Sequence, residues 1–326
     1  MRADLDVEIS AAGEVLEDFR LQAMHATFEF LLAQGVGQII IAGHLGRPEG
    51  AVKDDLRLNL VSKRLSEIIG WPIKKLDEAV PQELPADKIV MLENLRFESG
   101  EESNDESFAR KLASYADVYV NECFSTSHRA HASLVGVPKI LPSYAGLQLA
   151  REIKTLSTVL KNPARPLVVI IGGAKLETKV PVVNNLKNIA DTILVGGKIG
   201  FDPQISAERT PSSGQAAIIT PTDDIDQKDL GPQTTAEFVG IIKTAKTVVW
   251  NGPLGMFEDE KYTTSTKAIA EAVVNPAAKA IVGGGDTIAS LQKLGLLDKM
   301  GFVSTGGGAM LCFLAGQPLP GLIALE

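Results

Sequence analysis

Short runs of Val, Ile and Leu alternate along the chain with longer segments in which apolar residues recur at helical spacing. Short apolar runs favour buried strands, and the longer amphipathic segments favour helices. In the first half of the chain, the predicted strands are Gln38–Ala42, Ile73–Lys75, Lys88–Leu92 and Val118–Asn121. The predicted helices of this half are Phe19–Ala33, Leu58–Ile69 and Glu106–Tyr115.

The second half repeats the alternation. Its predicted strands are Leu167–Ile171, Thr192–Val195, Ala216–Ile219, Thr247–Trp250, Ala280–Val282 and Gly301–Ser304. Its predicted helices are Val180–Asn188, Thr234–Thr244, Ser265–Val273 and Thr287–Leu294. The stretch from Gly196 to Thr222 is rich in Ser, Pro and Gly and predicts mostly loop. Strands that alternate with helices predict an α/β protein with doubly wound parallel sheets of the Rossmann-like kind.

The length of 326 residues predicts two domains rather than one. Apolar residues from Tyr144 to Leu160 have mostly helical spacing, and the prolines at 163 and 166 then stop the helix. We therefore predict one domain at residues 1–143, an interdomain helix and hinge at 144–163, and a second domain at 164–303. Residues 304–326 are predicted to return toward the hinge and the first domain.

Charge and composition narrow the class of partner. The net charge is −8, and no long run of Lys and Arg is present, which argues against a nucleic-acid binder. The apolar runs are of strand length, far below the roughly 20 residues that span a bilayer, so no membrane partner is expected. Two cysteines far apart in the sequence suggest a reducing compartment, with the cytoplasm as the default. With nucleic acids and membranes disfavoured, we expect the partners of this protein to be small molecules.

Four glycine-rich turns end predicted strands of the second half. Glycine lets a backbone approach a phosphate closely, and a helix that starts at such a turn directs its free N–H groups at the anion. Parallel strands bring their carboxyl ends to one edge, so the turns predict a shared phosphate-binding site. The Walker A pattern is absent, which excludes a P-loop enzyme. The turns are Gly172-Gly173-Ala174-Lys175, Asn251-Gly252-Pro253-Leu254-Gly255, Gly283-Gly284-Gly285-Asp286-Thr287 and Gly306-Gly307-Gly308.

Charged residues beside these turns suggest phosphoryl transfer. Lys175 and Lys179 lie four residues apart, a spacing that projects both from one face of a helix start. Such a pair can neutralise a transferring phosphoryl group, although two solvated lysines are the alternative. Asp286 follows three glycines and could hold Mg²⁺, or it could serve as an ordinary helix N-cap.

Basic side chains instead follow the strands of the first half: His44, Arg47, Arg96, His128, Arg129 and His131. Guanidinium groups match carboxylate and phosphate oxygens, so this set suits a small acidic ligand that bears both. The two histidines three residues apart could instead be structural or suggest a metal, but further zinc ligands are missing. Cys123 stands in an apolar context and is predicted to be buried rather than nucleophilic.

Taken in order, these motifs resemble those of the phosphoglycerate kinase family. The resemblance runs from Arg2 to the last residues of the chain. It rests on Arg2-Ala3-Asp4-Leu5, His44-Leu45-Gly46-Arg47-Pro48, Leu92-Glu93-Asn94-Leu95-Arg96-Phe97, His128-Arg129-Ala130-His131-Ala132-Ser133, the glycine-rich turns with Trp250-Asn251-Gly252-Pro253, and Ser304-Thr305-Gly306-Gly307-Gly308.

The resemblance implies a two-domain kinase of glycolysis. Such a kinase moves a phosphoryl group between 1,3-bisphosphoglycerate and ADP, giving 3-phosphoglycerate and ATP, with Mg²⁺ and with a carboxyl group as the acceptor. It also implies a monomer whose ligands bind on facing sides of a cleft, and a hinge helix whose movement brings them together and excludes water.

Residue roles follow from the same resemblance. The implied catalytic residues are Arg20, Lys175, Gly285 and Gly307. The implied glycerate-binding residues are Asp4, Asp6, Arg20, His44, Arg47, Arg96 and Arg129. The implied nucleotide-binding residues are Gly173, Lys175, Lys179, Gly196, Gly197, Asn251, Pro253, Glu258, Gly284, Gly285, Asp286 and Thr287, with Asp286 as the residue that holds the metal.

Several departures from the family pattern leave a second function open. The chain begins at the first motif, which predicts a short or missing first strand. Asp6 replaces the usual asparagine and puts a carboxylate near an anionic ligand, and the Gly200–Thr222 region is shorter than usual beside the adenine pocket. The alternative is therefore a non-catalytic relative that binds 3-phosphoglycerate but has impaired nucleotide binding.

Overall fold

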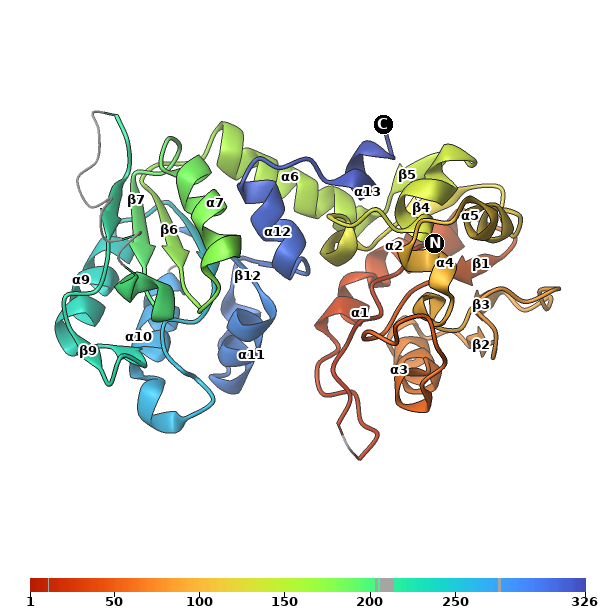
Figure 1. Ribbon diagram of the computed structural model, residues 1–326, viewed down its shortest axis with the longest axis horizontal. Helices are drawn as coiled ribbons and strands as arrows, with labels where there is room; N and C mark the ends of the chain where they lie inside the picture. Colours follow the sequence, from red (N-terminus) through yellow and green to blue (C-terminus); the bar gives the residue numbers. More distant parts are fainter. Residues whose placement is uncertain (11, 203–204, 206–213, 275–276) are drawn as a thin grey trace. The chain divides into compact units, whose positions relative to one another are not determined.

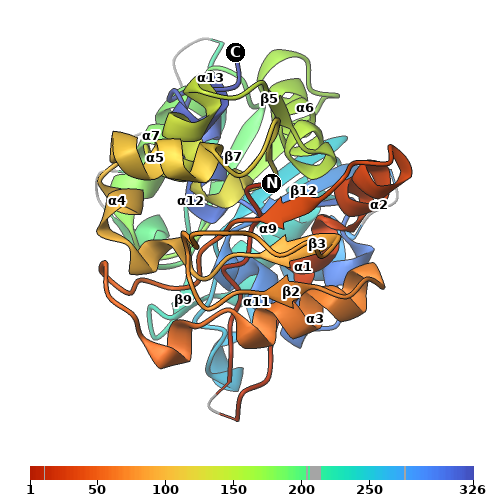
Figure 2. The same cartoon turned by 90° about the vertical axis from the view of Figure 1, so that its right-hand side faces the viewer.

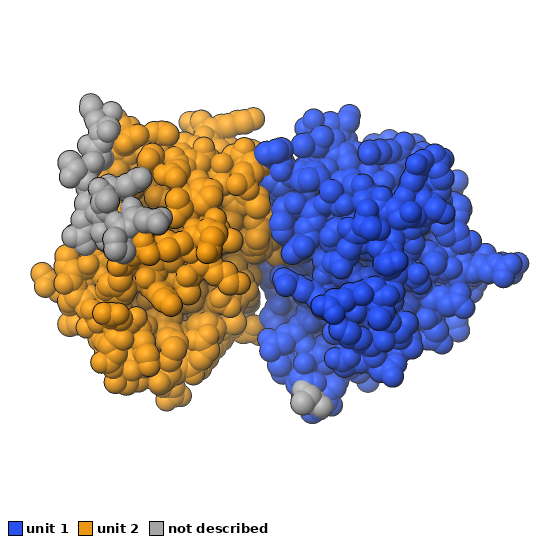
Figure 3. All heavy atoms as spheres, in the orientation of Figure 1, with its two compact units in different colours: residues 1–153, 318–326 blue, residues 154–317 orange. Residues whose placement is uncertain are grey.

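The computed structural model divides the chain into two compact units (Figure 3). The first unit contains residues 1–153 and 318–326, and the second contains residues 154–317. The structure describes residues 1–10, 12–202, 205, 214–274 and 277–326. Each unit is built on parallel strands with helices beside them, as the alternation of the sequence predicts (Figure 1).

A six-stranded parallel sheet in the order β13-β12-β11-β6-β7-β8 forms the second unit. All five residues of the central strand β6 are buried, which explains its unbroken run of Leu, Val and Ile. A short antiparallel hairpin of β9 and β10 lies outside this sheet. The strands are β6 (Leu167–Ile171), β7 (Thr192–Val195), β8 (Ala217–Ile219), β9 (Asp224–Ile225), β10 (Asp229–Leu230), β11 (Thr247–Asn251), β12 (Lys279–Gly283) and β13 (Phe302–Ser304).

Helices cover both faces of this sheet. Val168, Val248 and Trp250 share one core with Phe238 of α9 and Ile269 of α10. On the other side, α7 and α12 pack against each other (Figure 1). The longer helices of this unit are α7 (Leu176–Leu186), α9 (Pro232–Ile242), α10 (Thr264–Val273), α11 (Gly285–Lys293) and α12 (Gly307–Leu314). Short 3₁₀ turns are η6 (Lys198–Phe201), η7 (Glu260–Tyr262) and η8 (Leu297–Lys299).

The first unit has two small parallel sheets that the first residues of the chain connect. One sheet has the order β1-β3-β2, and the other pairs β4 with β5. Arg2 bridges both, since its N–H donates to Val120 at 2.8 Å and its carbonyl accepts from Glu122 at 2.9 Å, while Ala3 N–H donates to Ala42 at 2.8 Å. The strands are β1 (Ile39–Ile41), β2 (Lys74–Lys75), β3 (Ile89–Met91), β4 (Tyr119–Asn121) and β5 (Ser143–Ala145).

Alternate side chains of β1 point to two separate cores. Ile39 and Ile41 pack with Phe28 and Leu65, whereas Ile40 packs with the cluster that contains Phe108. Figure 2 views this unit, with α3 beside β2 and β3. Its helices are α1 (Phe19–Ala23), α2 (His25–Ala33), α3 (Asn59–Ile69), α4 (Ser99–Glu102), α5 (Glu106–Ala113), α13 (Pro320–Ile323) and the start of α6 (Leu147–Lys161), with short turns η1 (Asp54–Leu56), η2 (Leu95–Phe97), η3 (Phe124–Thr126), η4 (Ala132–Gly136) and η5 (Val137–Lys139).

Every strand that the sequence predicts is present within one or two residues, but several other elements differ. The predicted helix Phe19–Ala33 is two helices that meet at Met24. The helix predicted from Tyr144 starts at Leu147, because residues 143–145 pair with β4. The helix predicted at Val180–Asn188 starts at Leu176, ends at Leu186 and contains Pro181.

Two further differences concern the C-terminal half. Helix α12 begins at Gly307, inside the last glycine cluster, and no helix range was predicted for these residues. Within the stretch predicted as mostly loop, the 3₁₀ turn η6 was not predicted, whereas β8 is the strand predicted at Ala216–Ile219. Residues 203–204 and 206–213 of that stretch lie outside the described residues.

A buried carboxylate holds the start of α6 in the first unit. Glu122 is 2% exposed and accepts the N–H groups of Gln148 and Leu149, each at 3.1 Å, together with the hydroxyl of Thr27. Thr27 in turn accepts the N–H of Leu147 at 2.9 Å. These contacts satisfy N–H groups that a helix start leaves without an intrahelical partner, and they join α2, β4 and α6.

Replacement of Glu122 by Ala should therefore destabilise the first unit by about 2 kcal/mol or more, because two buried N–H groups and one hydroxyl lose their acceptor. Calorimetric unfolding would measure the change, with Glu106→Ala as the control, since Glu106 forms an exposed ion pair with Arg110. Glu122→Gln keeps one acceptor and should lose less. An unfolding midpoint for Glu122→Ala equal to that of the control would contradict this role.

Candidate active site

The carboxyl ends of β6, β7 and β11 meet at the point where the strand order of the second unit reverses. Strand β6 pairs with β7 on one side and with β11 on the other. The later strands therefore continue in opposite directions from β6, β8 beyond β7 and β12 beyond β11. The turns that follow are joined by backbone hydrogen bonds, from Gly172 N–H to Asn251 at 3.0 Å and from Gly173 N–H to Pro253 at 2.9 Å. This is the crevice at which open α/β sheets bind ligands.

The close approach of these turns requires glycine. A Cβ on Gly172 would lie 2.2 Å from the Pro253 oxygen, and one on Gly252 would lie 2.2 Å from the Gly172 oxygen. Gly197, after β7, has φ +62° and would bring a Cβ to 2.7 Å from Gly173 N. The glycines that the sequence assigned to phosphate binding therefore also allow three loops to interlock.

Lys179 is a buried cation at this edge of the sheet. Its side chain, 6% exposed, projects from the first turns of α7 and donates to the Asn251 carbonyl at 3.3 Å and to the Asn251 amide oxygen. Burial lowers the pKa of Lys179 to about 8, although Asp286 acts in the opposite direction. The interpretation of Lys179 as a solvated lysine is therefore wrong.

Lys175 does not share a helix face with Lys179, contrary to the prediction from their spacing. Its backbone is extended, with φ −99° and ψ 99°, because Lys175 is the N-cap residue that precedes α7. Its side chain is exposed. A helical spacing rule applies only inside a helix, and the helix begins one residue later.

The start of α11 lies close to the same asparagine. Gly284 is the N-cap residue with φ +100°, and a Cβ there would lie 3.2 Å from the Asn251 amide nitrogen. Thr287 is buried and accepts the Gly252 N–H at 2.7 Å, which joins α11 to the turn after β11. Asp286 is exposed in the first turn of α11. The interpretation of Asp286 as the helix N-cap is therefore wrong, because Gly284 has that position.

The last glycine cluster lies beside that helix start. A Cβ on Gly307 would lie 3.8 Å from the Cα of Gly284 and 3.9 Å from the N of Gly285. Gly285 and Gly307 are the first residues of α11 and α12. Two helix N-termini with free N–H groups and positive dipole ends therefore lie side by side, which favours an anion.

An open pocket of about 280 Å³ lies at this edge of the second unit. Five of its lining residues were predicted for the nucleotide: Gly173, Gly197, Pro253, Glu258 and Asp286. The other lining residues were not predicted, among them Lys198, Gln227, Lys228, Met256 and Phe257. Gln227 and Lys228 belong to the β9–β10 hairpin, which no sequence motif indicated. Gly196 is buried against Leu254 and Leu230 rather than lining this pocket.

Two carboxylate residues, Glu258 and Asp286, line this pocket. Among the residues that the structure describes, no three His, Cys, Asp or Glu side chains form a group able to hold a metal ion. Mg²⁺ is usually held by one or two carboxylates together with substrate phosphates. The exposed carboxylate of Asp286 fits that mode, since it faces the same pocket as the glycine turns.

In the first unit, four predicted ligand residues form one contact network. The Nη1 of Arg20 lies 3.9 Å from Oδ1 of Asp4 and 3.8 Å from Oδ2 of Asp6, and it also donates to the Asp6 carbonyl. The Nε2 of His44 lies 3.7 Å from Oδ2 of Asp6. Burial raises the pKa of Asp4 against the opposing effect of Arg20. The cation that could compensate Asp6 is therefore Arg20, which two carboxylates share.

Arg96 joins this network through the loop after β1. Its Nη1 donates to the Gly46 carbonyl at 2.7 Å, and Gly46 N–H donates to Oδ1 of Asp6 at 2.8 Å. The Nε of Arg96 pairs with Glu102 at 3.2 Å. Arg129 lies within electrostatic range of Arg96. Arg47 follows Gly46 and is exposed.

Burial favours the neutral form of two groups nearby, His44 and Cys123. Burial and the neighbouring guanidinium of Arg2 lower the pKa of His44 well below its usual value. Burial also raises the pKa of the Cys123 thiol, so the prediction of a buried and unreactive cysteine is confirmed. The positive charge of this network is therefore supplied by arginines.

Comparison with known proteins identifies the family. A family model described as phosphoglycerate kinase matches residues 1–202 and 201–317. The two matches meet inside the region that the sequence predicted to be shortened. The phosphoglycerate kinase of Moorella thermoacetica is 38% identical, with 100% of this chain and 95% of that protein covered. That of Acaryochloris marina is 36% identical, with coverage of 100% and 94%.

Solved structures of phosphoglycerate kinases also resemble this chain. The phosphoglycerate kinase of Coxiella burnetii has a TM-score of 0.82 and 32% identity, and that of Pyrococcus horikoshii has a TM-score of 0.86 and 29% identity. Both alignments cover 99% of this chain and 94% of the other. Among the described residues, no helix is both long and apolar enough to cross a bilayer. The chain belongs to the phosphoglycerate kinase family.

Proposed function

We propose that this member of the phosphoglycerate kinase family catalyses the reversible transfer of a phosphoryl group between 1,3-bisphosphoglycerate and ADP, which gives 3-phosphoglycerate and ATP in glycolysis. In the ATP-consuming direction, the acceptor is the carboxyl group of 3-phosphoglycerate. The single observation that carries the proposal is the family match, which covers the chain from residue 1 to residue 317. No observation among the described residues favours the non-catalytic alternative.

The second unit binds the nucleotide in this proposal. The supporting geometry is the pocket bordered by Gly173, Gly197, Pro253, Glu258 and Asp286, together with the two helix starts beside it. Lys179 neutralises phosphate charge next to Asn251, and Lys175 acts on the transferred group. Gly285 and Gly307 present N–H groups to that group, and Thr287 fixes the helix start.

The first unit binds the glycerate ligand. This role is supported by one network of predicted ligand residues, which contains Asp4, Asp6, Arg20, His44 and Arg96. Arg129 is close enough to Arg96 for their charges to interact. A ligand with a carboxyl and a phosphate group matches guanidinium groups bidentately. Arg20 also serves the transferred phosphoryl group, and Arg47 contributes a further cation from the same loop.

Mg²⁺ is the proposed cofactor, and Asp286 would hold it together with nucleotide phosphates. When bound, the ion supplies positive charge that neutralises the developing charge on the phosphates. We also propose that residues 1–143 form the phosphoglycerate-binding domain and that residues 164–303 form the nucleotide-binding domain. Residues 144–163 would form the interdomain helix and hinge, and residues 304–326 the C-terminal segment. We further propose a cytoplasmic location, since Cys123 and Cys312 are both free. The family resemblance also suggests a monomer.

Replacement of Lys175 by Ala should lower turnover about 10²- to 10⁴-fold while leaving 3-phosphoglycerate binding nearly intact, because an exposed lysine beside the proposed transfer site acts mainly on the transition state. A coupled assay of ATP-dependent phosphorylation of 3-phosphoglycerate measures turnover, and calorimetry measures binding. Lys243→Ala, at an exposed lysine after α9, is the matched control. Near-normal turnover in Lys175→Ala would reject the catalytic role.

ADP affinity should fall about tenfold between pH 7 and pH 9, because Lys179 is charged below its pKa of about 8 and neutral above it, while bound phosphates retain the charged form. Titration calorimetry without Mg²⁺ at successive pH values tests this. Lys179→Met should bind ADP weakly and with little change over the same range. An equal pH dependence in wild type and Lys179→Met would show that another group titrates.

Asp6→Asn should bind 3-phosphoglycerate about three- to tenfold more tightly, since it removes one of two carboxylates that share Arg20 while keeping an acceptor for Gly46 N–H. Calorimetry compares it with Asp54→Asn, a change at an exposed carboxylate that pairs with Arg57. Unchanged or weaker binding in Asp6→Asn would mean that the carboxylate does not oppose the ligand.

A further inference from the structure

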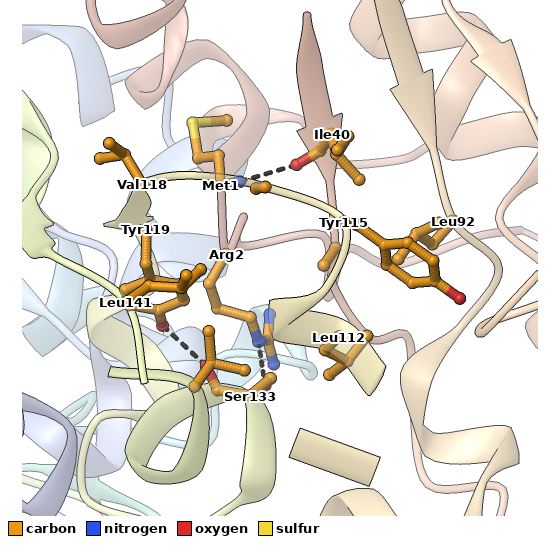
Figure 4. A pocket seen from close by; sticks show the side chains of 13 residues that line it. Met1, Arg2, Ile40, Leu92, Leu112, Tyr115, Val118, Tyr119, Ser133 and Leu141 are labelled. Carbon is orange, nitrogen blue, oxygen red and sulfur yellow. Dashed lines mark hydrogen bonds between the residues drawn. The ribbon is translucent and has the colours of Figure 1, made fainter. Parts of the chain in front are cut away.

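A buried arginine that no site prediction included touches the ligand-binding histidine of the first unit. The side chain of Arg2 is 1% exposed, and its Nη2 lies 2.9 Å from Nδ1 of His44. Its Nη1 donates to the Ala3 carbonyl at 2.6 Å, and its Nε donates to the Ser133 hydroxyl at 2.9 Å. Figure 4 shows the Arg2 side chain extending to Ser133 at the edge of a small apolar cavity.

This contact determines the tautomer of His44. A guanidinium group carries only donors and stays charged, so the atom that it contacts must accept a hydrogen bond. Nδ1 of His44 therefore carries no proton, and the proton of the neutral ring is on Nε2. A cation on Nδ1 also opposes protonation of the ring, as do the charges of Arg20 and Arg96 nearby.

The proton on Nε2 points into the acidic network. Nε2 of His44 lies 3.7 Å from Oδ2 of Asp6, the carboxylate that also faces Arg20. An Nε2–H group of His44 can donate a hydrogen bond to an oxygen of an acidic ligand in this network. An unprotonated Nε2 carries a lone pair and would repel that oxygen. The tautomer thus decides whether His44 supports or opposes binding of an acid.

Arg2 is itself fixed by a second buried charge. Glu101 is fully buried and accepts from the Ser133 hydroxyl at 2.6 Å and from the Ser133 N–H at 3.0 Å. The same hydroxyl accepts from Arg2, so Ser133 links a buried cation to a buried anion. The backbone of Arg2 is also held on both sides, by Val120 and by Glu122. The guanidinium therefore has little freedom to leave His44.

We propose that Arg2 is a positioning residue that holds His44 as the neutral tautomer protonated on Nε2, so that His44 donates a hydrogen bond to the acidic ligand of the first unit. The inference rests on the proposed function for the identity of that ligand, 3-phosphoglycerate. The tautomer itself is a property of the ligand-free protein.

Nitrogen NMR of histidine-labelled, full-length protein tests the proposal directly. A two-dimensional ring spectrum distinguishes Nε2–H from Nδ1–H, and His44→Gln assigns the signal among the four histidines. The variants are Arg2→Met, which removes every donor, and Arg2→Lys, which keeps one charged donor. Arg110→Met is the matched control, since Arg110 is exposed and pairs with Glu106.

In wild type we expect only Nε2–H at pH 7. Arg2→Met should mix the tautomers and weaken 3-phosphoglycerate binding about tenfold, the effect of one lost hydrogen bond, while ADP binding stays unchanged. Arg2→Lys should have a tautomer ratio and a 3-phosphoglycerate affinity between those of wild type and Arg2→Met. Arg110→Met should match wild type in both. If Arg2→Met does not fold, the wild-type and Arg2→Lys spectra decide.

A proton on Nδ1 in wild type, or an unaltered tautomer in folded Arg2→Met, would overturn the proposal. An altered tautomer with unchanged 3-phosphoglycerate affinity would overturn its binding half. Failure of the wild-type protein to bind 3-phosphoglycerate would overturn the proposed function instead, and the spectrum of the ligand-free protein would still decide whether Arg2 sets the tautomer.

Discussion

Parallel pairing of strands is the constraint on which both units depend. Hydrogen bonds between parallel strands leave all their carboxyl ends at one edge, and the loops that carry the chemistry must meet there. In the second unit the register joins Ile171 to Asn251, so the turns that follow these residues come into direct backbone contact. In the first unit, the backbone of Arg2 pairs in parallel with Ala42, which follows β1, and with Asn121 of β4. Arg2 therefore links the two small sheets.

The two units handle negative charge in different ways. The second unit offers backbone N–H groups at glycine turns and helix starts, and one desolvated lysine whose hydrogen bonds go to Asn251. The first unit offers guanidinium groups that are already engaged, since Arg20 lies between Asp4 and Asp6 and Arg96 pairs with Glu102. A ligand there must compete with carboxylates of the protein, so its affinity depends on how these charges are shared.

Buried polar groups connect the framework of the first unit to its site. Ser133 bridges Glu101 and Arg2, and Arg2 contacts both the strand pairing and His44. Glu122 performs a comparable task at the start of α6. Groups of this kind are costly to bury unless every donor and acceptor is paired, which ties the geometry of the site to the integrity of the sheet.

The sequence by itself determined the strands, the α/β class and the glycine turns, because short β-branched runs and strand-end glycines are local signals. Ordered motifs also determined the family. Tertiary structure decided that Lys179 is buried while Lys175 is exposed, that Asp6 faces Arg20, that Gln227 and Lys228 reach the pocket, and that Arg2 meets His44. These contacts join residues far apart in the chain, so periodicity and spacing carry no information about them. Burial and the choice of hydrogen-bond partner arise only once the sheet has formed.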